Sequence, residues 1–198
     1  MRSRNRRIRG HHLRRFTITD LPLQGLKLIE RQTLGDARGF LSRMFCAKEL
    51  ALADWKRPVS QINLTMTTKR GTVRGMHFQY PPHSEMKLVN CVRGSVFDVA
   101  IDLRANSQTF LQWHAEELSA QNGRALLIPE GFAHGFQTLT DDCELLYLHS
   151  MPYAPSYEGA LNAQDPALAV NWPLAITELS ERDRVHPNLT GQFTGLII

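Results

Sequence analysis

Short runs of β-branched and aromatic residues recur along most of this chain, and Gly, Pro, Asn or Asp interrupts them about every ten residues. Within the runs, apolar and polar residues alternate, as in strands that have one face in a core. Only residues 47–55, AKELALADW, have the pattern of a convincing helix. The sequence therefore predicts an all-β, predominantly antiparallel fold, a sandwich or a barrel, with a few short peripheral helices. The predicted strands are residues 25–34, 59–67, 72–79, 87–92, 95–104, 110–118, 124–129, 133–139 and 143–150.

The charge of the chain is unevenly distributed. The net charge of +4 over 198 residues comes from residues 1–15, which hold seven arginines and no acid. Residues 16–198 keep 16 basic and 19 acidic residues, a net charge of −3. We expect residues 1–15 to be a disordered head and residues 16–198 to form a single domain. A nucleic-acid-binding role would rest on that head alone, so we expect no nucleic-acid partner.

The composition also bears on the compartment. No run approaches the roughly 18 apolar residues of a membrane span, and the Arg-rich start lacks the apolar stretch of a secretory signal. Cys46, Cys91 and Cys143 lie far apart with no paired spacing, which argues against a disulfide framework or a zinc knuckle. We expect a cytoplasmic protein without a membrane partner.

Polar residues that share one face of a strand give the first indication of a site. Gln61 and Asn63 lie opposite the apolar residues of QINLTMT, Tyr147 and His149 do so in ELLYLHS, and Asp98 and Asp102 do so in SVFDVAIDL. Such a face normally meets water. In a barrel, however, one face of every strand points into the lumen, where polar residues can line a ligand pocket.

The stretch GRALLIPEGFAH contains Gly123, Pro129, Gly131 and His134 at the spacing of the second sequence motif of the cupin barrels. In that motif the glycines form a turn and the His faces the lumen. A hairpin turn followed by a structural His would give the same spacing. The His-x-His pair of the first motif, found in metal-binding cupins, does not occur in this sequence.

A metal site is one interpretation of the neighbouring residues. His83, Glu85 and His134 offer two imidazoles and a carboxylate, which suffice for non-haem iron. The ammonium group of Lys87, two residues beyond Glu85, would face the same lumen and repel a metal ion. We therefore expect no metal and no cofactor, and a metal-dependent cupin remains the less favoured alternative.

A metal-free interpretation uses His77 as a base, Lys87 as a fixed cation and Tyr147 as an acid. Removing a proton beside a carbonyl needs a base tuned near neutrality, a positive charge where the enolate oxygen develops, and a proton donor on the opposite face. Each residue alone has an ordinary structural explanation. The hypothesis therefore requires that the three side chains converge in the fold.

Several blocks of the sequence, in one order, closely resemble the dTDP-4-dehydrorhamnose 3,5-epimerase family of cupin-fold enzymes, over about residues 20–187. The resemblance implies an antiparallel double-stranded β-helix, the cupin jelly-roll barrel, without metal and usually as a homodimer with exchanged edge strands. It also implies epimerisation of a dTDP-linked 4-keto-6-deoxy sugar at C3 and C5 through an enolate, which gives dTDP-4-dehydro-L-rhamnose. The blocks are QINLTMTTKRGTVRGMHFQ, KLVNCVRGSVFDVAIDLR, LSAQNGRALLIPEGFAHGFQTL, YAP and LSERD.

The resemblance also implies roles for single residues. His77 would be the base and Asp183 its carboxylate partner, although Arg182 replaces the usual Lys before Asp183. Lys87 would hold the enolate oxygen, and Tyr147 would be the acid. The residues implied to contact the substrate are Arg38, Gln61, Asn63, Arg74, His134 and Tyr153.

Two features depart from a simple match. Strict alternation places Arg74 and His77 on opposite faces of their strand, unless Gly75 hosts a β-bulge that shifts the phase. Leu41 and Arg43 stand where the family often has Phe and Glu. Arg43 thus places a base where the family has an acid, and we expect this exchange to alter how the nucleotide or a partner chain is held.

Other activities would use the same residues. A C3-only epimerase, or a ketoisomerase that acts on a related 4-keto sugar nucleotide, would keep the base, the cation and the acid. A non-catalytic sugar-nucleotide-binding module would have no use for all of them together.

Overall fold

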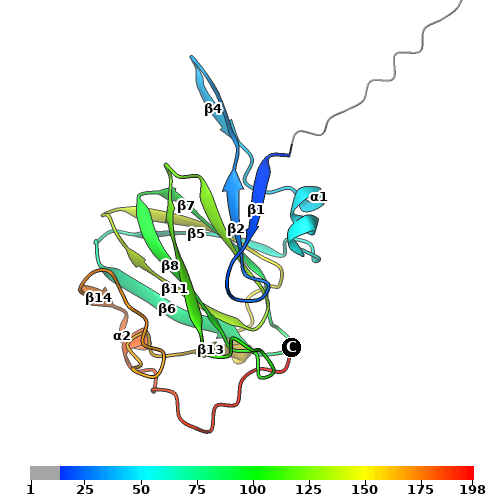
Figure 1. Cartoon of the computed structure of the whole chain (residues 1–198). Helices are drawn as coiled ribbons and strands as arrows, with labels where there is room; N and C mark the ends of the chain where they lie inside the picture. The colour runs from blue at the N-terminus through cyan, green and yellow to red at the C-terminus, as the bar shows by residue number, and fades with distance from the viewer. Residues whose placement is uncertain (1–13) are drawn as a thin grey trace, which may run out of the picture.

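Two sheets packed face to face form the body of the protein (Figure 1). The computed structural model describes residues 14–198, so the predicted head lies outside the described residues except for Arg14 and Arg15. The first sheet has the strand order β1-β2-β10-β7-β12-β5, and the second has β13-β6-β11-β8-β9, with β14 beside β6. Within the described part, the strands of both sheets pair antiparallel except β14, which runs parallel to β6.

The bounds of the elements follow from the backbone hydrogen bonds. The first sheet contains β1 (Phe16–Asp20), β2 (Lys27–Arg31), β5 (Gln61–Thr67), β7 (Lys87–Arg93), β10 (Arg124–Ile128) and β12 (Cys143–His149). The second contains β6 (Thr72–Gln79), β8 (Ser95–Asp102), β9 (Trp113–Ser119), β11 (Phe132–Thr138), β13 (Glu158–Ala160) and β14 (Glu178–Leu179). The remaining elements are the hairpin β3 (Thr33–Asp36) and β4 (Gly39–Ser42), the helices α1 (Ala47–Leu50) and α2 (Glu181–Arg184), and the 3-10 turns η1 (Ala51–Ala53) and η2 (Pro155–Tyr157).

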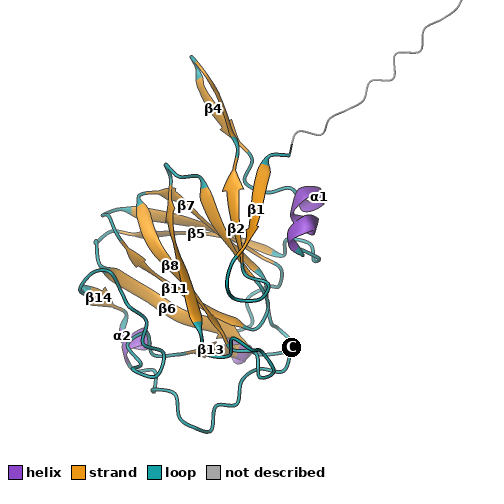
Figure 2. Cartoon of the chain, viewed as in Figure 1, coloured by secondary structure: helices purple, strands orange, loops and turns teal. Residues whose placement is uncertain are grey.

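Each predicted strand overlaps an observed one, so the all-β antiparallel prediction is confirmed. The sequence analysis missed β4, β13 and β14, which have four residues or fewer and are too short to show a clear alternation. It also missed β1, although Phe16 and Ile18 alternate with threonines there. The predicted helix over residues 47–55 is a single α-helical turn followed by η1, and it ends at Asp54, which has a left-handed φ of 65°. As Figure 2 shows, the short helices lie at the periphery of the sheets.

Apolar side chains form three layers. The layer between the sheets joins residues from strands of both, among them Val89, Ala100, Leu126, Phe136 and Leu145. The outer face of the second sheet packs under the C-terminal segment, and the outer face of the first sheet packs under α1 and η1. Because both outer faces are largely covered, one end of the space between the sheets can carry polar side chains while the fold keeps an apolar core.

Strand β5 is an edge strand whose apolar face points to solvent and whose polar face points to the interior. Its apolar residues Ile62, Leu64 and Met66 are 59%, 61% and 47% exposed, whereas Asn63 faces the interior and lines a cavity. The expectation that a polar strand face can point into the lumen is thereby confirmed for this strand. The apolar outer face is left uncovered in the single chain.

The β3–β4 hairpin projects from the body (Figure 1), and Phe40 and Leu41 on it are 76% and 70% exposed. Arg43, just beyond β4, forms an ion pair with Glu49 of α1 at 2.5 Å.

Among the described residues, no helix is both long and apolar enough to cross a membrane.

Candidate active site

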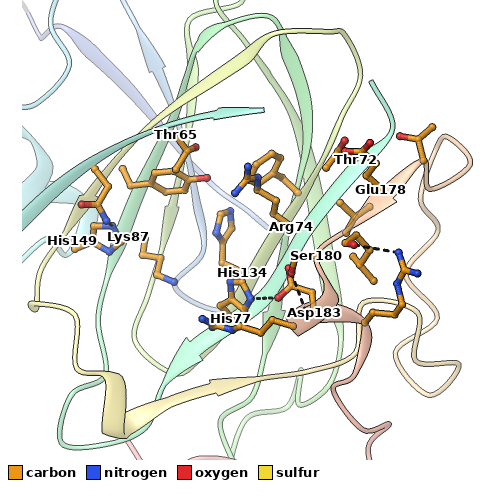
Figure 3. A pocket seen from close by; sticks show the side chains of 18 residues that line it. Thr65, Thr72, Arg74, His77, Lys87, His134, His149, Glu178, Ser180 and Asp183 are labelled. Atoms are coloured by element: carbon orange, nitrogen blue, oxygen red, sulfur yellow. Dashed lines mark hydrogen bonds and ion pairs between the residues drawn. The ribbon is translucent and has the colours of Figure 1, made fainter. Parts of the chain in front are cut away.

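A cavity of about 620 Å³ opens at one end of the space between the two sheets (Figure 3). One wall comes from β6, β11, β14 and α2, and the facing wall comes from β5, β7 and β12. Chain segments that are far apart in the sequence therefore meet around one space. The predicted site residues that line it are Asn63, Arg74, His77, Lys87, His134, Tyr147 and Asp183.

On the first wall, His77 of β6 meets Asp183 of α2. The Nε2 atom of His77 lies 2.7 Å from Asp183 Oδ1, and because a carboxylate can only accept, the imidazole donates. Asp183 is 5% exposed at its side chain and His77 is 33% exposed, so the imidazole is open to the cavity. Burial alone would raise the pKa of the Asp183 carboxyl, but the hydrogen bond from His77 and its charge hold that pKa below the usual value. Asp183 is thus an ionised acceptor that fixes the imidazole.

The short helix α2 holds Asp183 in place. Ser180 is the N-cap of α2, and its hydroxyl accepts a hydrogen bond from the Asp183 amide at 3.0 Å. The Gly75 amide donates to the second carboxylate oxygen of Asp183 at 3.5 Å. Asp183 therefore contacts β6 at two points.

A bulge at Gly75 explains how Arg74 and His77 can point to the same side of β6. Strand β6 pairs with β11 so that His77 faces His134 and Arg74 faces Phe136, which shows a bulge in β6 between them. Gly75 has φ +130°, and a Cβ there would lie 2.5 Å from the Gly135 Cα. The predicted bulge is confirmed. Arg74 and His77 both line the cavity as a result.

The facing wall carries Lys87 of β7 and Tyr147 of β12. Lys87 points into the cavity from this wall, as Figure 3 shows, and its Nζ lies 3.3 Å from the Glu85 carboxylate. Burial raises the pKa of the Tyr147 hydroxyl, so this group keeps its proton at neutral pH. The wall opposite His77 thus holds a cation and a proton donor.

A second His–Asp pair contributes its imidazole, His134, to the lining of the cavity. His134 of β11 donates from Nε2 to Asp98 Oδ1 of β8 at 2.8 Å, and both side chains are buried. The ring of Tyr147 lies 6.0 Å from that of His134. Sequence reasoning assigned no role to Asp98, although a carboxylate on a strand that is otherwise largely apolar was a signal.

The metal-ligand set considered from the sequence does not form in residues 14–198. Glu85 contacts Lys87 and His149, and His134 is hydrogen-bonded to Asp98. The ring of His83 packs against that of Tyr157, with 4.2 Å between the ring centroids. This set was the less favoured interpretation of the sequence, and nearer partners occupy two of its three groups, Glu85 and His134.

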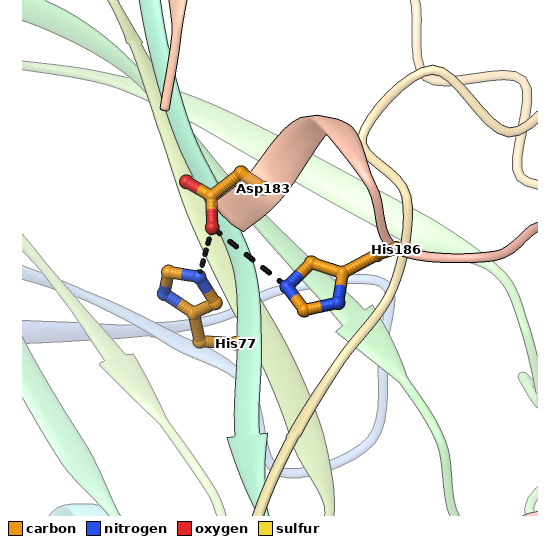
Figure 4. Close-up of side chains that lie close together, drawn as sticks. All are labelled: His77, Asp183 and His186. Atoms are coloured by element: carbon orange, nitrogen blue, oxygen red, sulfur yellow. Dashed lines mark hydrogen bonds and ion pairs between the residues drawn. The ribbon is translucent and has the colours of Figure 1, made fainter. Parts of the chain in front are cut away.

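His77, Asp183 and His186 offer three donor atoms within 4.8 Å of one another (Figure 4). Two imidazoles and one carboxylate are ligands that a transition metal accepts. The Asp183 oxygen, however, already accepts the hydrogen bond from His77, and His186 Nε2 lies farther away, at 3.9 Å. The observed arrangement is that of a hydrogen-bonded pair with a neighbouring imidazole.

The remaining predicted substrate contacts are divided between two places. Gln61 and Tyr153 line a second hollow of about 350 Å³, which shares Asn63, His77, His149 and Arg182 with the first. Arg182 is ion-paired with Glu158 there. The two hollows therefore adjoin.

Arg38 lies in the turn between β3 and β4 and lines neither hollow. Its side chain is 89% exposed and pairs with Asp36 of the same hairpin. The single chain does not bring Arg38 to the other predicted site residues.

Known proteins share both the sequence and this architecture. Residues 20–191 match the family described as dTDP-4-dehydrorhamnose 3,5-epimerase. The chain belongs to this family. The dTDP-4-dehydrorhamnose 3,5-epimerase of Sinorhizobium fredii is 40% identical over 91% of this chain and 93% of its own length. The chain is accordingly an isomerase-class enzyme, as the sequence predicts.

Solved structures agree in fold. The dTDP-4-dehydrorhamnose 3,5-epimerase of Bacillus anthracis, with TDP and PPi bound, aligns with a TM-score of 0.85 at 36% identity, covering 88% of this chain and 99% of its own. The Legionella pneumophila enzyme in complex with dTDP-4-keto-L-rhamnose gives 0.81 at 38% identity, with 85% and 89% covered. A 3'-monoepimerase from Streptomyces bikiniensis in complex with dTDP-quinovose gives 0.79 at 34% identity, with 85% of each chain covered. The fold is the predicted cupin jelly roll.

Proposed function

We propose that this enzyme converts dTDP-4-dehydro-6-deoxy-D-glucose to dTDP-4-dehydro-L-rhamnose by inverting C3 and C5. The observation that carries the proposal is the arrangement of one cavity, with the His77–Asp183 pair on one wall and Lys87 and Tyr147 on the other. Inversion needs a base and an acid on opposite faces of the sugar, and the two sheets supply them. The names and bound dTDP-sugars of the similar proteins support the choice of substrate.

In the proposed first step, His77 removes the proton from the carbon beside the C4 ketone. Its Nε2–H donates to Asp183, so the lone pair lies on Nδ1, and this nitrogen accepts the substrate proton. The Asp183 carboxylate then stabilises the imidazolium ion that forms.

The electrons left on carbon move to the C4 oxygen as an enolate. The Lys87 ammonium stabilises that oxygen, and Tyr147 returns a proton to carbon from the opposite face. Solvent then takes the proton from His77 and returns one to Tyr147, and the same steps at the second centre complete the double inversion. The step uses no metal and no cofactor, so we expect a chelator to leave the rate unchanged.

The nucleotide end of the substrate needs hydrogen-bond donors. Arg74 offers a planar guanidinium that can donate two hydrogen bonds to a phosphate. We propose that Gln61, Asn63, His134 and Tyr153 contact the remaining diphosphate, sugar and nucleoside groups.

We also propose that the enzyme is a cytoplasmic homodimer and that residues 16–198 of each chain form one domain. The uncovered apolar face of β5 and the projecting β3–β4 hairpin are surfaces suited to a second copy. In such a dimer the hairpin would carry Arg38 toward the site of its partner.

Incubation with dTDP-4-dehydro-6-deoxy-D-glucose in deuterated water tests the reaction, with NMR to read label at C3 and C5 separately. Label at both carbons and a product of the L series are expected. Label at C3 alone would support the second candidate, a C3-only epimerase, which the similarity to the Streptomyces bikiniensis 3'-monoepimerase favours. A 3-keto product would point to a ketoisomerase, and no label at either carbon would overturn the proposal.

A further inference from the structure

Two buried side chains next to Lys87 have no role in the reaction described above. Glu85 lies two residues before Lys87, and His149 is the cross-strand neighbour of Lys87 on β12. The side chains of Lys87, Glu85 and His149 are 11%, 9% and 13% exposed. Figure 3 shows His149 and Lys87 together at one side of the cavity. Three ionisable groups are thus packed together where one cation is needed.

The two oxygens of Glu85 have different partners. Oε2 accepts from His149 Nδ1 at 2.7 Å, and Oε1 lies 3.3 Å from Lys87 Nζ. Burial alone would raise the pKa of the Glu85 carboxyl, but the hydrogen bond from His149 and the charge of Lys87 hold that pKa below its usual value. Glu85 is therefore a buried carboxylate fixed from both sides.

The tautomer of His149 follows from its other neighbour. The Asn63 amide nitrogen, a donor, lies 3.4 Å from His149 Nε2, and Asn63 Oδ1 accepts from Gln61 at 3.1 Å, which sets the amide orientation. This orientation places His149 Nε2 to accept from Asn63, while His149 Nδ1 donates to Glu85 Oε2. Gln61 in turn accepts from the backbone amide of Tyr153 at 3.0 Å. A directed chain of hydrogen bonds thus runs from the second hollow to Lys87.

We propose that Glu85 and His149 are positioning residues that hold the Lys87 ammonium at the place where the enolate oxygen develops. A lysine ammonium sits on a flexible stem of four carbons, and a fixed carboxylate confines it to one direction. Because Glu85 donates nothing and receives one contact from Lys87, two of the three ammonium protons remain for the substrate. His149 prevents Glu85 from turning away. The inference rests on the proposed function, since it concerns the cation of that reaction.

Substitution Glu85→Gln tests the role of the carboxylate with little change in shape. We expect kcat to fall about 10- to 100-fold, while KM and the affinity for dTDP stay within about twofold, because the altered group acts on Lys87 and not on the nucleotide. His149→Phe keeps an aromatic ring beside Tyr147 but removes the donor, and a loss of kcat of about tenfold is expected. Glu116→Gln is the matched control, because Glu116 forms a 3.0 Å pair with His114 on β9 and lines neither hollow.

A double-mutant cycle separates positioning from a merely structural role. If Glu85 acts through Lys87, Glu85→Gln costs no further activity in a Lys87→Met background, where turnover is read from slow deuterium incorporation. An equal loss in both backgrounds would overturn the inference, as would a folded Glu85→Gln variant with wild-type kcat. If Glu85→Gln does not fold, the same cycle with His149→Phe decides. Failure of the wild-type enzyme to exchange hydrogen at C3 or C5 would instead contradict the proposed function.

Discussion

Asp183 follows His77 by 106 positions in the chain, yet its Oδ1 atom lies 2.7 Å from His77 Nε2. The contact joins α2 to β6, which lies between β13 and β11 in the second sheet. It fixes the tautomer of the imidazole, as the proposed base requires. Its partners on the facing wall, Lys87 and Tyr147, belong to the other sheet.

Replacing Asp183 by Asn removes the negative charge while keeping the shape of the side chain. The amide can no longer stabilise an imidazolium ion, so we expect kcat to fall about 10²- to 10⁴-fold with a small change in the affinity for dTDP. The rate of epimerisation is measured by NMR on reactions quenched at set times, and the affinity for dTDP is measured by calorimetry. A variant with wild-type turnover would contradict the role proposed for Asp183.

Replacing Tyr147 by Phe should separate proton removal from inversion. His77 can still take the proton from C3, and solvent can return deuterium to the same face, so label should enter without a change in configuration. Mass spectrometry of recovered substrate and NMR of its stereochemistry measure the two outcomes. Inversion at the normal rate in the Phe variant would show that another group is the acid.

Acid pH should destabilise the enzyme partly through Glu85. The folded state holds the pKa of this carboxyl below its usual value, so the unfolded chain binds more protons once the pH drops below about 5. The stabilisation is complete above the unfolded pKa and is lost as the pH falls through the folded pKa. Urea unfolding between pH 7 and pH 3 should show a shallower loss of the free energy of unfolding in Glu85→Gln. Parallel curves for the variant and the wild type would rule this out.

Gly75→Ala should damage the fold and the site together. A methyl group there would meet the Gly135 Cα at 2.5 Å and the His134 carbonyl oxygen at 2.9 Å, on backbone of positive φ. We expect the free energy of unfolding to fall by about 2 to 5 kcal/mol, as measured by denaturant titration. Gly191→Ala is the control, since no atom lies within 4 Å of its added carbon and a change within about 0.5 kcal/mol is expected.

Leu64→Lys tests the proposed dimer. Leu64 is 61% exposed in the centre of the apolar face of β5, and an ammonium group buried there against a second copy would be costly. Light scattering after size exclusion should show monomers for this variant and dimers for the wild type. Leu52→Lys, at a side chain of similar exposure on η1, should remain dimeric. Dimers of the Leu64 variant would exclude this face as the interface.

The strands of the barrel were readable from the sequence because each is a local pattern of alternating residues. The alternation also indicated which residues of β5 and β12 share a face with Asn63 and Tyr147. The same alternation separated Arg74 from His77, and the bulge at Gly75 could only be suggested, since its existence depends on the pairing of β6 with β11.

By itself the sequence determined the all-β class, the family resemblance and the chemical groups His77, Asp183, Lys87 and Tyr147. Only the tertiary structure decided which groups meet: Asp98 with His134, Glu85 with His149 and Lys87, and Arg38 away from the cavity of its own chain. The physical reason is that strand periodicity is encoded over neighbouring residues, whereas the Asp98–His134 and Glu85–His149 contacts join segments 36 and 64 positions apart in the chain. Their geometry is set by the packing of two sheets around a shared core.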